Sequence, residues 1–455
     1  MSVGLRTLVS RLSWITFSHV VTSILRLLNN VVLARLLAPS LLGMFLIVNL
    51  VRTGIELVTD VGIGQNIVSN KNGHNPDFYD TAWTIQVLRG LVLGVVCIVS
   101  ASVVAHAFGK PELAIILPFA ALFSIISGFS SVSTFLIQKN IQVARYAKFE
   151  IVLASLNIII YCALALITPT IWALVIGTVI SFAALNVSTY LLIPGIRHRF
   201  FIDRNYAREI LVFGKWIFWS SMISFLAMNF DRLYFARQIT LTELGIYGIA
   251  RNLTETITQL AIRYGNLLLF PMVAGMEATP LQVRSRIRHG RRLILLGAAV
   301  ALGALVAGSD LVIRILYDPR YHYAGIILPL LLIGAWVAIL STVNEYMLLG
   351  VSRPAMPTYA NGAKFLSYAV ATPIAFHYFG FLGAIIALIF GEAIKYVSLW
   401  VQSRGHNLSF ARDDLALSLL FLASIGLFRE LLFAMGLTPD LLSLFPWIGN
   451  LNAAA

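Results

Sequence analysis

The sequence predicts an all-α polytopic membrane protein with 12–14 transmembrane helices, arranged as two repeated six-helix lobes around a central cavity. Three observations predict this fold: the composition, the length of the apolar runs and an internal repeat. The chain of 455 residues is 59% hydrophobic and only 12% charged, with a mean hydropathy of +0.85. A soluble domain carries about 25% charged residues, so the composition indicates a membrane protein.

The apolar runs set the number of spans, because a helix of about 20 apolar residues crosses the hydrocarbon core. The first run is too long for a removable signal peptide and has no small-residue cleavage site after it. The tail 435–455 is interrupted by Pro439 and Pro446, which leaves a fourteenth span open. The predicted spans are 14–37, 41–64, 81–107, 114–137, 150–168, 171–193, 210–236, 243–272, 292–312, 324–349, 358–377, 380–401 and 415–434.

The internal repeat relates residues 14–47 to residues 216–249 by a shift of 202 positions without a gap. Six spans separate the two copies, so both copies have the same orientation and the repeat axis lies along the membrane normal. We therefore predict an N-terminal lobe at 1–196, a cytoplasmic linker at 197–209, a C-terminal lobe at 210–402, and one or more extra helices at 403–455. The identical pairs are Trp14/Trp216, Ile15/Ile217, Ser18/Ser220, Ala34/Ala236, Arg35/Arg237, Leu42/Leu244, Gly43/Gly245 and Ile47/Ile249.

Loop charges predict the orientation of the chain in the membrane. Most loop Lys and Arg residues lie before span 1 and in the loops after spans 4, 6 and 8, all on one side if the spans alternate. Cytoplasmic loops carry this excess, so we expect a cytoplasmic N-terminus. The net charge of +13 is then mostly a topology signal, with a smaller attraction to anionic lipid.

The sequence lacks the motifs that indicate several other classes of function. The chain contains no Walker loop, and its eight His residues show no metal-ligand spacing. Cys97 and Cys162 lie inside apolar spans and are interpreted as packing residues. No loop is long enough to hold a soluble catalytic domain, so we expect no cofactor and no metal.

Polar residues inside the spans carry the functional prediction, because ionisable groups are costly in lipid and usually face a cavity or a partner. Spans 2 and 8 each carry a polar stripe at helical spacing, and the two stripes have the same phase under the 202-residue shift. Spans 1, 3 and 7 add an arginine or an aspartate. The candidate residues are Arg26, Arg52, Arg89, Arg251, Arg263, Asn49, Asn252, Gln259, Asn266, Glu56, Asp231 and Glu255.

Two interpretations of the stripes stay open. In the first, Arg52–Glu56 and Arg251–Glu255 are ion pairs at i, i+4 that only stabilise the helix bundle. In the second, the stripes line a cavity with surplus positive charge that binds an anion. Arg26, Arg89 and Arg263 have no acidic residue within one turn on their own helix, which favours the second. Phosphate is the natural guest, because guanidinium groups bind it bidentately.

The second half of the C-terminal lobe carries Glu345, Lys364, Glu392 and Lys395, which the sequence presents as isolated charges. We interpret Lys364 and Lys395 as residues near cytoplasmic helix ends whose ammonium groups extend to the interface.

Two blocks of residues carry a family resemblance. Asn30–Phe45 (NVVLARLLAPSLLGMF) and 60–64 (DVGIG) resemble the opening of polysaccharide repeat-unit flippases. So do FGKW at 213–216, NFDRLY at 229–234 and LGIYGIARNL at 244–253. These flippases belong to the multidrug/oligosaccharidyl-lipid/polysaccharide exporter superfamily.

The resemblance implies two six-helix lobes and the transfer of an undecaprenyl-pyrophosphate-linked oligosaccharide from the cytoplasmic to the periplasmic leaflet of a bacterial inner membrane. Relatives that flip lipid II line their cavity with arginines of spans 1, 2 and 8, and Arg26, Arg52 and Arg251 hold matching places here. The chain departs from them at Leu27, where those relatives have an acidic residue beside the span 1 arginine, which puts the same ion-coupling site in doubt.

We therefore expect a flippase of lipid-linked repeat units for exopolysaccharide, lipopolysaccharide O-antigen or capsule, working by alternating access. The five candidate arginines would hold the diphosphate, the Asn and Gln residues would contact sugar hydroxyls, and Glu56, Asp231 and Glu255 would carry coupling protons or balance charge. Coupling to an H+ or Na+ gradient and contacts with polymerase and chain-length proteins are expected. The alternatives are a cation-coupled multidrug antiporter, which needs an acidic cavity, and a polysaccharide polymerase or ligase, which needs a large external loop.

Overall fold

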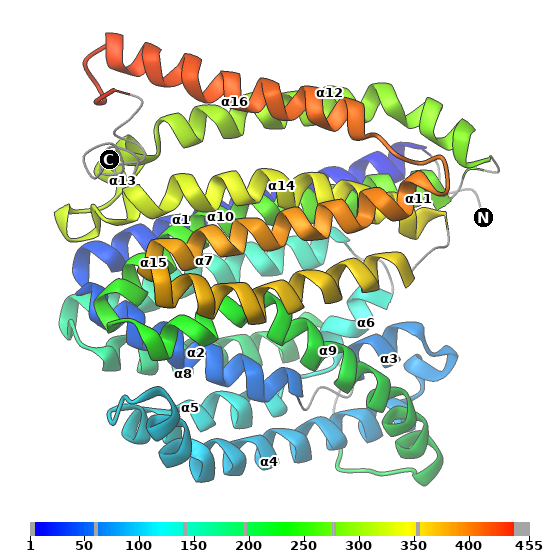
Figure 1. Cartoon of the computed structure of the whole chain (residues 1–455). Helices are drawn as coiled ribbons and strands as arrows, with labels where there is room; N and C mark the ends of the chain where they lie inside the picture. The colour runs from blue at the N-terminus through cyan, green and yellow to red at the C-terminus, as the bar shows by residue number, and fades with distance from the viewer. Residues whose placement is uncertain are drawn as a thin grey trace. The chain divides into compact units, whose positions relative to one another are not determined.

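The computed structural model describes residues 5–58, 62–139, 143–193, 198–274, 276, 279–351 and 355–440, and all of its regular elements in these ranges are helices. The chain forms two compact units, Met1–Gly245 and Ile246–Ala455, and both are built of helices (Figure 1). The predicted all-α fold is confirmed. The predicted lobe boundaries at 196 and 210 stay predictions.

The first unit holds nine α-helices and the start of a tenth among its described residues. Helices α4 and α5 lie side by side, as do α1 and α7, and α7 and α8. The elements are α1 (Leu5–Leu36), α2 (Pro39–Val58), α3 (Ile63–Ser69), η1 (Lys71–His74), α4 (Pro76–Phe108), α5 (Leu113–Gly128), α6 (Ser133–Lys139), α7 (Val143–Ile167), α8 (Ile171–Leu192) and α9 (Arg204–Gln238).

The second unit contains most of α10, which begins in the first. Within this unit α14 packs on α15, and α12 packs on α16. The elements are α10 (Leu241–Tyr264), the π-helix η2 (Gly265–Leu269), α11 (Phe270–Ala274), α12 (Pro280–Ala307), α13 (Ser309–Leu316), η3 (Pro319–Tyr321), α14 (Ala324–Gly350), α15 (Ala355–Arg404) and α16 (Ala411–Ala434). Each of the thirteen predicted spans lies on one or more of these helices.

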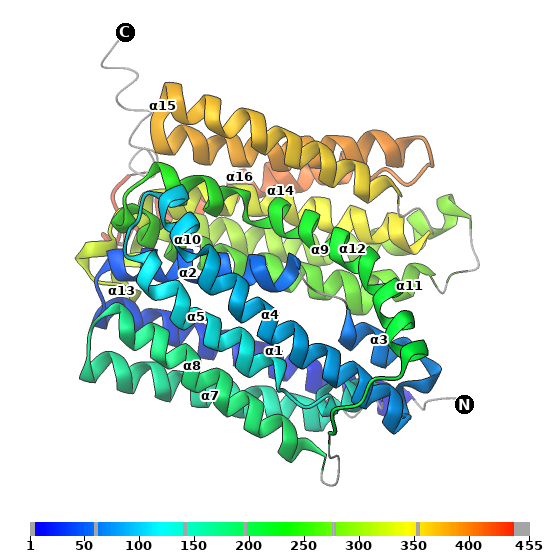
Figure 2. The same ribbon diagram turned by 90° about the horizontal axis from the view of Figure 1, so that it is seen from below.

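Two predicted spans are joined in α15, and others are divided between consecutive helices, as 292–312 is at Gly308 between α12 and α13. Helix α15 has a non-helical residue at Gly380, with φ 66° and ψ −158°, and its two arms lie side by side (Figure 2). Only glycine reaches this backbone conformation without strain. The division at 377/380 is thereby confirmed. The predicted span 114–137 is instead interrupted at 129–132, between α5 and α6.

A side chain from α4 stabilises this interruption. Gln86 Nε2 lies 3.0 Å from the carbonyl oxygen of Gly128 and 2.9 Å from that of Ser130, and it donates to both. The last carbonyls of a helix need partners. Because the partner comes from another helix, the run of apolar residues gave no sign of the break.

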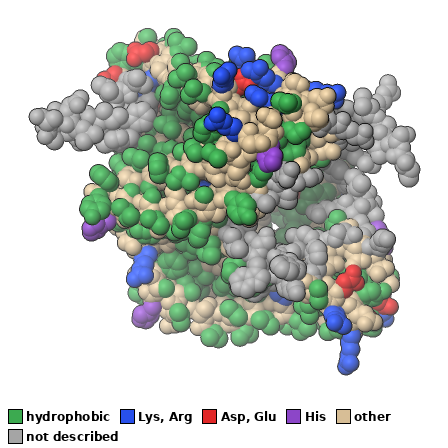
Figure 3. All heavy atoms as spheres, turned by 45° about the vertical axis from the view of Figure 1, so that its right-hand side comes forward, with side chains coloured by type: hydrophobic (Ala, Val, Ile, Leu, Met, Phe, Trp, Pro, Cys, Tyr) green, Lys and Arg blue, Asp and Glu red, His purple; other side chains and the backbone are tan. Residues whose placement is uncertain are grey.

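Eight helices in the described part of the chain are long and apolar enough to cross a membrane: α2, α4, α7, α8, α12, α14, α15 and α16. Their outer surfaces carry bare apolar side chains, such as Val99 (73% exposed) and Ile167 (75% exposed), and Figure 3 shows broad hydrophobic areas on one face. Such surfaces are normal only when lipid covers them.

Helix α10, which is described along its whole length, is not among these eight, although the repeat places it at span 8. Polar side chains such as Arg251 and Glu255 lower its hydropathy, and α1 and α9 also carry charged residues: Arg26 on α1, and Asp231 and Arg232 on α9. A long helix of this composition is stable in a bilayer only where its polar face meets protein or water.

The two copies of the repeat touch at equivalent residues inside the first unit. A Cβ atom on Gly43 of α2 would clash with the carbonyl oxygen of Leu241, and a Cβ on Gly245 of α10 would clash with that of Pro39. Residues 39 and 241, and 43 and 245, are both related by the 202-residue shift. The contact is therefore reciprocal, as expected for two equivalent helices that cross about a pseudo-twofold axis.

The extra C-terminal helix α16 is anchored to α12 along its length (Figure 1). Arg291 Nη2 and Asp414 Oδ1 lie 2.6 Å apart, with side chains 1% and 2% exposed. Near the other end, Arg429 Nη1 donates to the carbonyl oxygen of Ala307, the last residue of α12 (2.7 Å), and lies 2.8 Å from Asp310 Oδ1 on α13. One extra helix is thus present at 411–434, and residues 441–455, where a fourteenth could lie, are outside the described residues.

Candidate functional site

On α2, the predicted stripe forms the ion pair that its spacing indicates. Arg52 Nη1 lies 2.8 Å from Glu56 Oε2, and the two side chains are 15% and 26% exposed. The Arg52 guanidinium also lies over the ring of Phe182, 5.2 Å from its centroid. Asn49, one turn earlier, is half-buried. Arg52 is thus held by a carboxylate and an aromatic face while part of it stays accessible.

Helix α4 brings a second arginine to the same place. Arg89 Nη2 donates a hydrogen bond of 2.5 Å to the backbone carbonyl of Glu56. This joins residues on α2 and α4 that are 33 positions apart in the chain. The structure therefore brings Arg52, Glu56 and Arg89 together within the first unit.

Glu56 and Arg89 line a half-open pocket of about 220 Å³. Its walls come from α2, α4, α5 and the interruption before α6, where the chain reads SGFSSVST at 127–134. Besides the two charged residues, the polar lining consists of Gln86, Ser124, Ser127, Ser130, Ser131 and Thr134. This combination of hydroxyl, amide and guanidinium groups is suited to a polar, oxygen-rich ligand.

Only two residues of this pocket, Glu56 and Arg89, are among the candidates predicted from the sequence. Gln86 and the hydroxyl residues were missed, because serine and threonine are common in membrane helices. The signal that could have found them is the density of small polar residues around Gly128 inside an otherwise apolar run. Non-helical backbone at membrane depth occurs where it is buried in protein or lines a cavity.

On α1, Arg26 is exposed, and its hydrogen bonds to described residues stay within its own helix. Its Nε donates to the carbonyl oxygen of Thr22 (3.4 Å) and its Nη2 to Ser23 Oγ (3.3 Å). No acidic side chain pairs with Arg26 among the residues that the structure describes. On α9, by contrast, Asp231 is buried, at 3% exposed.

In the second unit, α10 repeats the pattern of α2. Arg251 Nε lies 3.4 Å from Glu255 Oε1, with the side chains 26% and 32% exposed. Asn252 and Gln259 are exposed, and Arg263 is half-buried. Asn266 lies in the π-helix η2, exposed, and shares a side-chain hydrogen bond with Tyr346. A π-helical turn is rare and is frequent at functional sites.

The interpretation of Lys364 and Lys395 as residues that extend to the interface is wrong. Lys364 Nζ lies 2.5 Å from Glu392 Oε1, and Lys395 Nζ lies 2.7 Å from Glu345 Oε2. The partners are 28 and 50 positions away, so no helical periodicity could reveal them. These charges neutralise one another between α14 and the two arms of α15.

No group of three or more His, Cys, Asp or Glu side chains that could hold a metal ion occurs in the described ranges. The cationic residues dominate the candidate set instead. An arrangement of several guanidinium groups with hydroxyl and amide groups nearby is suited to a phosphorylated, sugar-like ligand.

Comparisons with known proteins decide the family. Residues 32–348 match a protein family described as "Polysaccharide biosynthesis protein". The chain belongs to this family. The resemblance of its two repeated blocks to polysaccharide flippases is thereby confirmed.

Two curated relatives have names that agree. The chain is 22% identical over 318 residues to the teichuronic acid biosynthesis protein TuaB of Bacillus subtilis, which covers 70% of this chain and 65% of that protein, slightly under two thirds. It is 21% identical over 445 residues to the succinoglycan biosynthesis transport protein ExoT of Rhizobium meliloti, covering 95% of this chain and 86% of that protein.

Two solved structures share the fold. The lipid II flippase MurJ, in an inward closed conformation, superposes with a TM-score of 0.75 at 14% identity, covering 97% of this chain and 95% of that one. An inward-facing multidrug transporter of the MATE family gives a TM-score of 0.60 at 15% identity, covering 88% and 95%. The shared fold confirms the predicted all-α, multi-pass membrane arrangement.

Proposed function

We propose that this family member translocates undecaprenyl-pyrophosphate-linked oligosaccharide repeat units from the cytoplasmic to the periplasmic leaflet of a bacterial inner membrane by alternating access. The product would serve the biosynthesis of exopolysaccharide, O-antigen or capsule. The names of the relatives support a polysaccharide cargo. The shared fold supports a carrier that moves its cargo between its lobes.

One observation carries the proposal: the predicted spans 1, 2, 3 and 8 all carry arginines. A diphosphate cannot cross hydrocarbon without neutralisation. Arg26, Arg52, Arg89, Arg251 and Arg263 would supply five positive charges against three negative ones from Glu56, Asp231 and Glu255. The surplus favours an anionic cargo over the cationic cargo of a multidrug antiporter.

The remaining candidates would bind the rest of the headgroup. Asn49, Asn252, Gln259 and Asn266 are assigned to sugar hydroxyls, and the pocket beside Arg89 adds Gln86 and its hydroxyl residues. Glu56, Asp231 and Glu255 would balance charge or exchange the protons or Na+ that drive the cycle. The polyprenyl tail would stay in lipid throughout.

The decisive experiment separates a cargo site from a structural ion pair. Arg26→Ala, Arg52→Ala and Arg251→Ala should each lower polymer export at least about tenfold, because each loses charge-assisted hydrogen bonds to phosphate. Lys at these positions should restore export only in part, since an ammonium lacks the bidentate geometry. The readouts are exported polymer, the leaflet that holds the lipid-linked precursor, and the amount of inserted protein.

The double variant Arg52→Ala/Glu56→Ala provides the control. If the pair is only structural, removing both charges avoids an uncompensated carboxylate and export should recover. If Arg52 binds the cargo, the double variant stays inactive. Arg288→Ala/Asp413→Ala removes an ion pair of 2.7 Å between a 55% exposed arginine and an 11% exposed aspartate, and this variant should export normally. Normal export by all three single Ala variants would refute the cationic site.

A further inference from the structure

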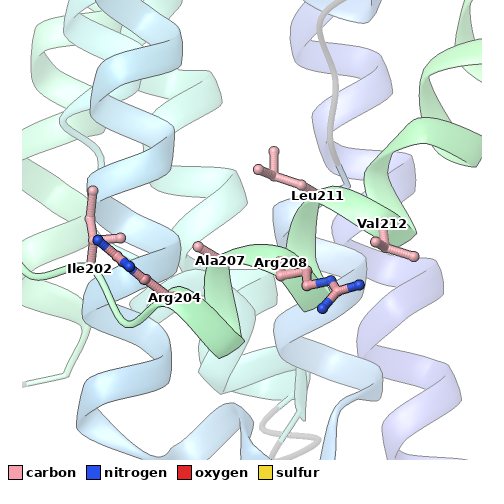
Figure 4. Close-up of a pocket in the computed structure, with 6 residues that line it drawn as sticks. All are labelled: Ile202, Arg204, Ala207, Arg208, Leu211 and Val212. Carbon is pink, nitrogen blue, oxygen red and sulfur yellow. The ribbon is translucent and has the colours of Figure 1, made fainter.

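An open groove of about 440 Å³ lies on the outer face of the first turns of α9. Ile202, Arg204, Ala207, Arg208, Leu211 and Val212 line it (Figure 4). The helical members are spaced three, four, seven and eight positions apart, which places them on one face of the helix. The groove is thus a continuous apolar surface with two guanidinium groups at its edges.

The opposite face of the same turns is fixed to the first unit. Ile210 is fully buried in a cluster that also contains Phe78. Asn75 Nδ2 donates to the Tyr206 hydroxyl (3.2 Å), and Asn70 donates to Glu209 (2.7 Å). These contacts prevent rotation of the helix, so the groove face must point outward.

The chain before α9 is also anchored. The backbone amide of Phe201 donates to Thr84 Oγ1, and that of Asp203 donates to Thr81 Oγ1, both at 3.1 Å. The Asp203 side chain caps the helix itself by accepting from Asn205. The backbone amides at the N-terminus of α9 therefore have hydrogen-bond partners within the chain, and this end of the helix is not itself an anion site.

The two arginines of the groove have no such partners. Arg204 and Arg208 are exposed and make no hydrogen bond or ion pair with any residue in the described part of the chain. Ile202, Leu211 and Val212 are 50–53% exposed beside them. In Figure 4 the two guanidinium groups point toward opposite sides of the groove rather than toward one point.

We propose that this groove binds an anionic phospholipid of the adjacent leaflet, with its phosphate on Arg204 or Arg208 and an acyl chain along Ile202, Leu211 and Val212. An apolar surface edged by cations fits a lipid that joins a hydrocarbon chain to a negative headgroup. Divergent guanidiniums suit separate headgroups. A single diphosphate would need them to converge, which argues against the lipid-linked cargo as occupant. The proposal does not depend on the proposed function.

The test uses the full-length protein in nanodiscs of equal parts phosphatidylglycerol and phosphatidylcholine. Lipids that stay bound after transfer to detergent are counted by native mass spectrometry. The wild type should retain phosphatidylglycerol preferentially, and Arg204→Gln/Arg208→Gln should lower that preference about fivefold per arginine. Arg204→Lys/Arg208→Lys should keep most of it, because the attraction is largely Coulombic.

The matched control is Arg286→Gln/Arg292→Gln, which removes two exposed arginines from α12 and should leave the preference intact. An equal loss in this control, or an unchanged preference in Arg204→Gln/Arg208→Gln, would overturn the proposal. So would displacement of phosphatidylglycerol from the wild type by an equal amount of undecaprenyl diphosphate, since the groove would then belong to the cargo lipid.

Discussion

At the residue scale, the linker that precedes α9 depends on two side chains. Arg199 Nη2 lies 2.6 Å from Asp77 Oδ1, and its Nε lies 3.2 Å from Asp80 Oδ2. His198 stacks on Trp83 at 5.2 Å between ring centroids, and its Nε2 lies 2.8 Å from Ser131 Oγ. These contacts fix the connection between the predicted lobes to the start of α4.

The imidazole of His198 makes this linker sensitive to pH. Burial lowers the pKa of His198 below its ordinary value, although the nearby Asp80 carboxylate acts in the opposite direction. The unfolded chain therefore binds a proton below about pH 6.5 that the folded protein resists. The stability linked to His198 is present above that pH and is lost as the pH falls.

We predict a lower melting temperature for the wild type at pH 5.5 than at pH 7.5, with a smaller drop in His198→Gln. Thermal unfolding of the purified protein measures both. His289→Gln, at an exposed position of α12, should behave like the wild type. An identical pH dependence in His198→Gln would show that other groups cause the drop.

At the element scale, the reciprocal contact of α2 and α10 leaves no room for a side chain at Gly43 or Gly245. Gly43→Ala and Gly245→Ala should each destabilise the protein by about 1–3 kcal/mol, because each new methyl group forces two backbones apart. The double variant should cost less than the sum, since one separation relieves both clashes. Melting temperatures in detergent measure these effects.

Gly297→Ala on α12 is the control for this prediction. Its new Cβ would meet no atom within 4 Å, and alanine favours the helix over glycine by up to about 1 kcal/mol. We expect a neutral or stabilising effect. Equal destabilisation by Gly297→Ala would mean that the losses at 43 and 245 reflect something other than the crossing.

The same elements show what sequence reasoning could reach. Apolar runs located every long helix, and the short interval around Gly380 revealed the turn inside α15. The i, i+4 spacing predicted the Arg52–Glu56 and Arg251–Glu255 pairs. The break at 129–132, the Arg89–Glu56 contact and the Lys364–Glu392 pair were out of reach, because each depends on a partner from another helix whose register the sequence does not specify.

At the scale of the whole molecule, the apolar runs predict the number of spans, and the loop charges predict the side on which each loop lies. The segments that hold Phe200 and Arg286 are predicted to lie on the cation-rich side, and the turn at Glu112 on the other. Thirteen spans would also place Met435, just after α16, on the side of Glu112. The cargo path has a direction only if these sides are correct.

Single cysteines test this arrangement after Cys97 and Cys162 are replaced by Ala. In intact cells, Glu112→Cys and Met435→Cys should react with a thiol reagent that cannot cross the membrane, because both positions are exposed and predicted to face outward. Phe200→Cys and Arg286→Cys should react only after the membrane is opened. Labelling of 286 from outside would reverse the topology. If position 112 is labelled and position 435 is protected, the number of spans before residue 435 must be even. In that case α16 would not cross the membrane.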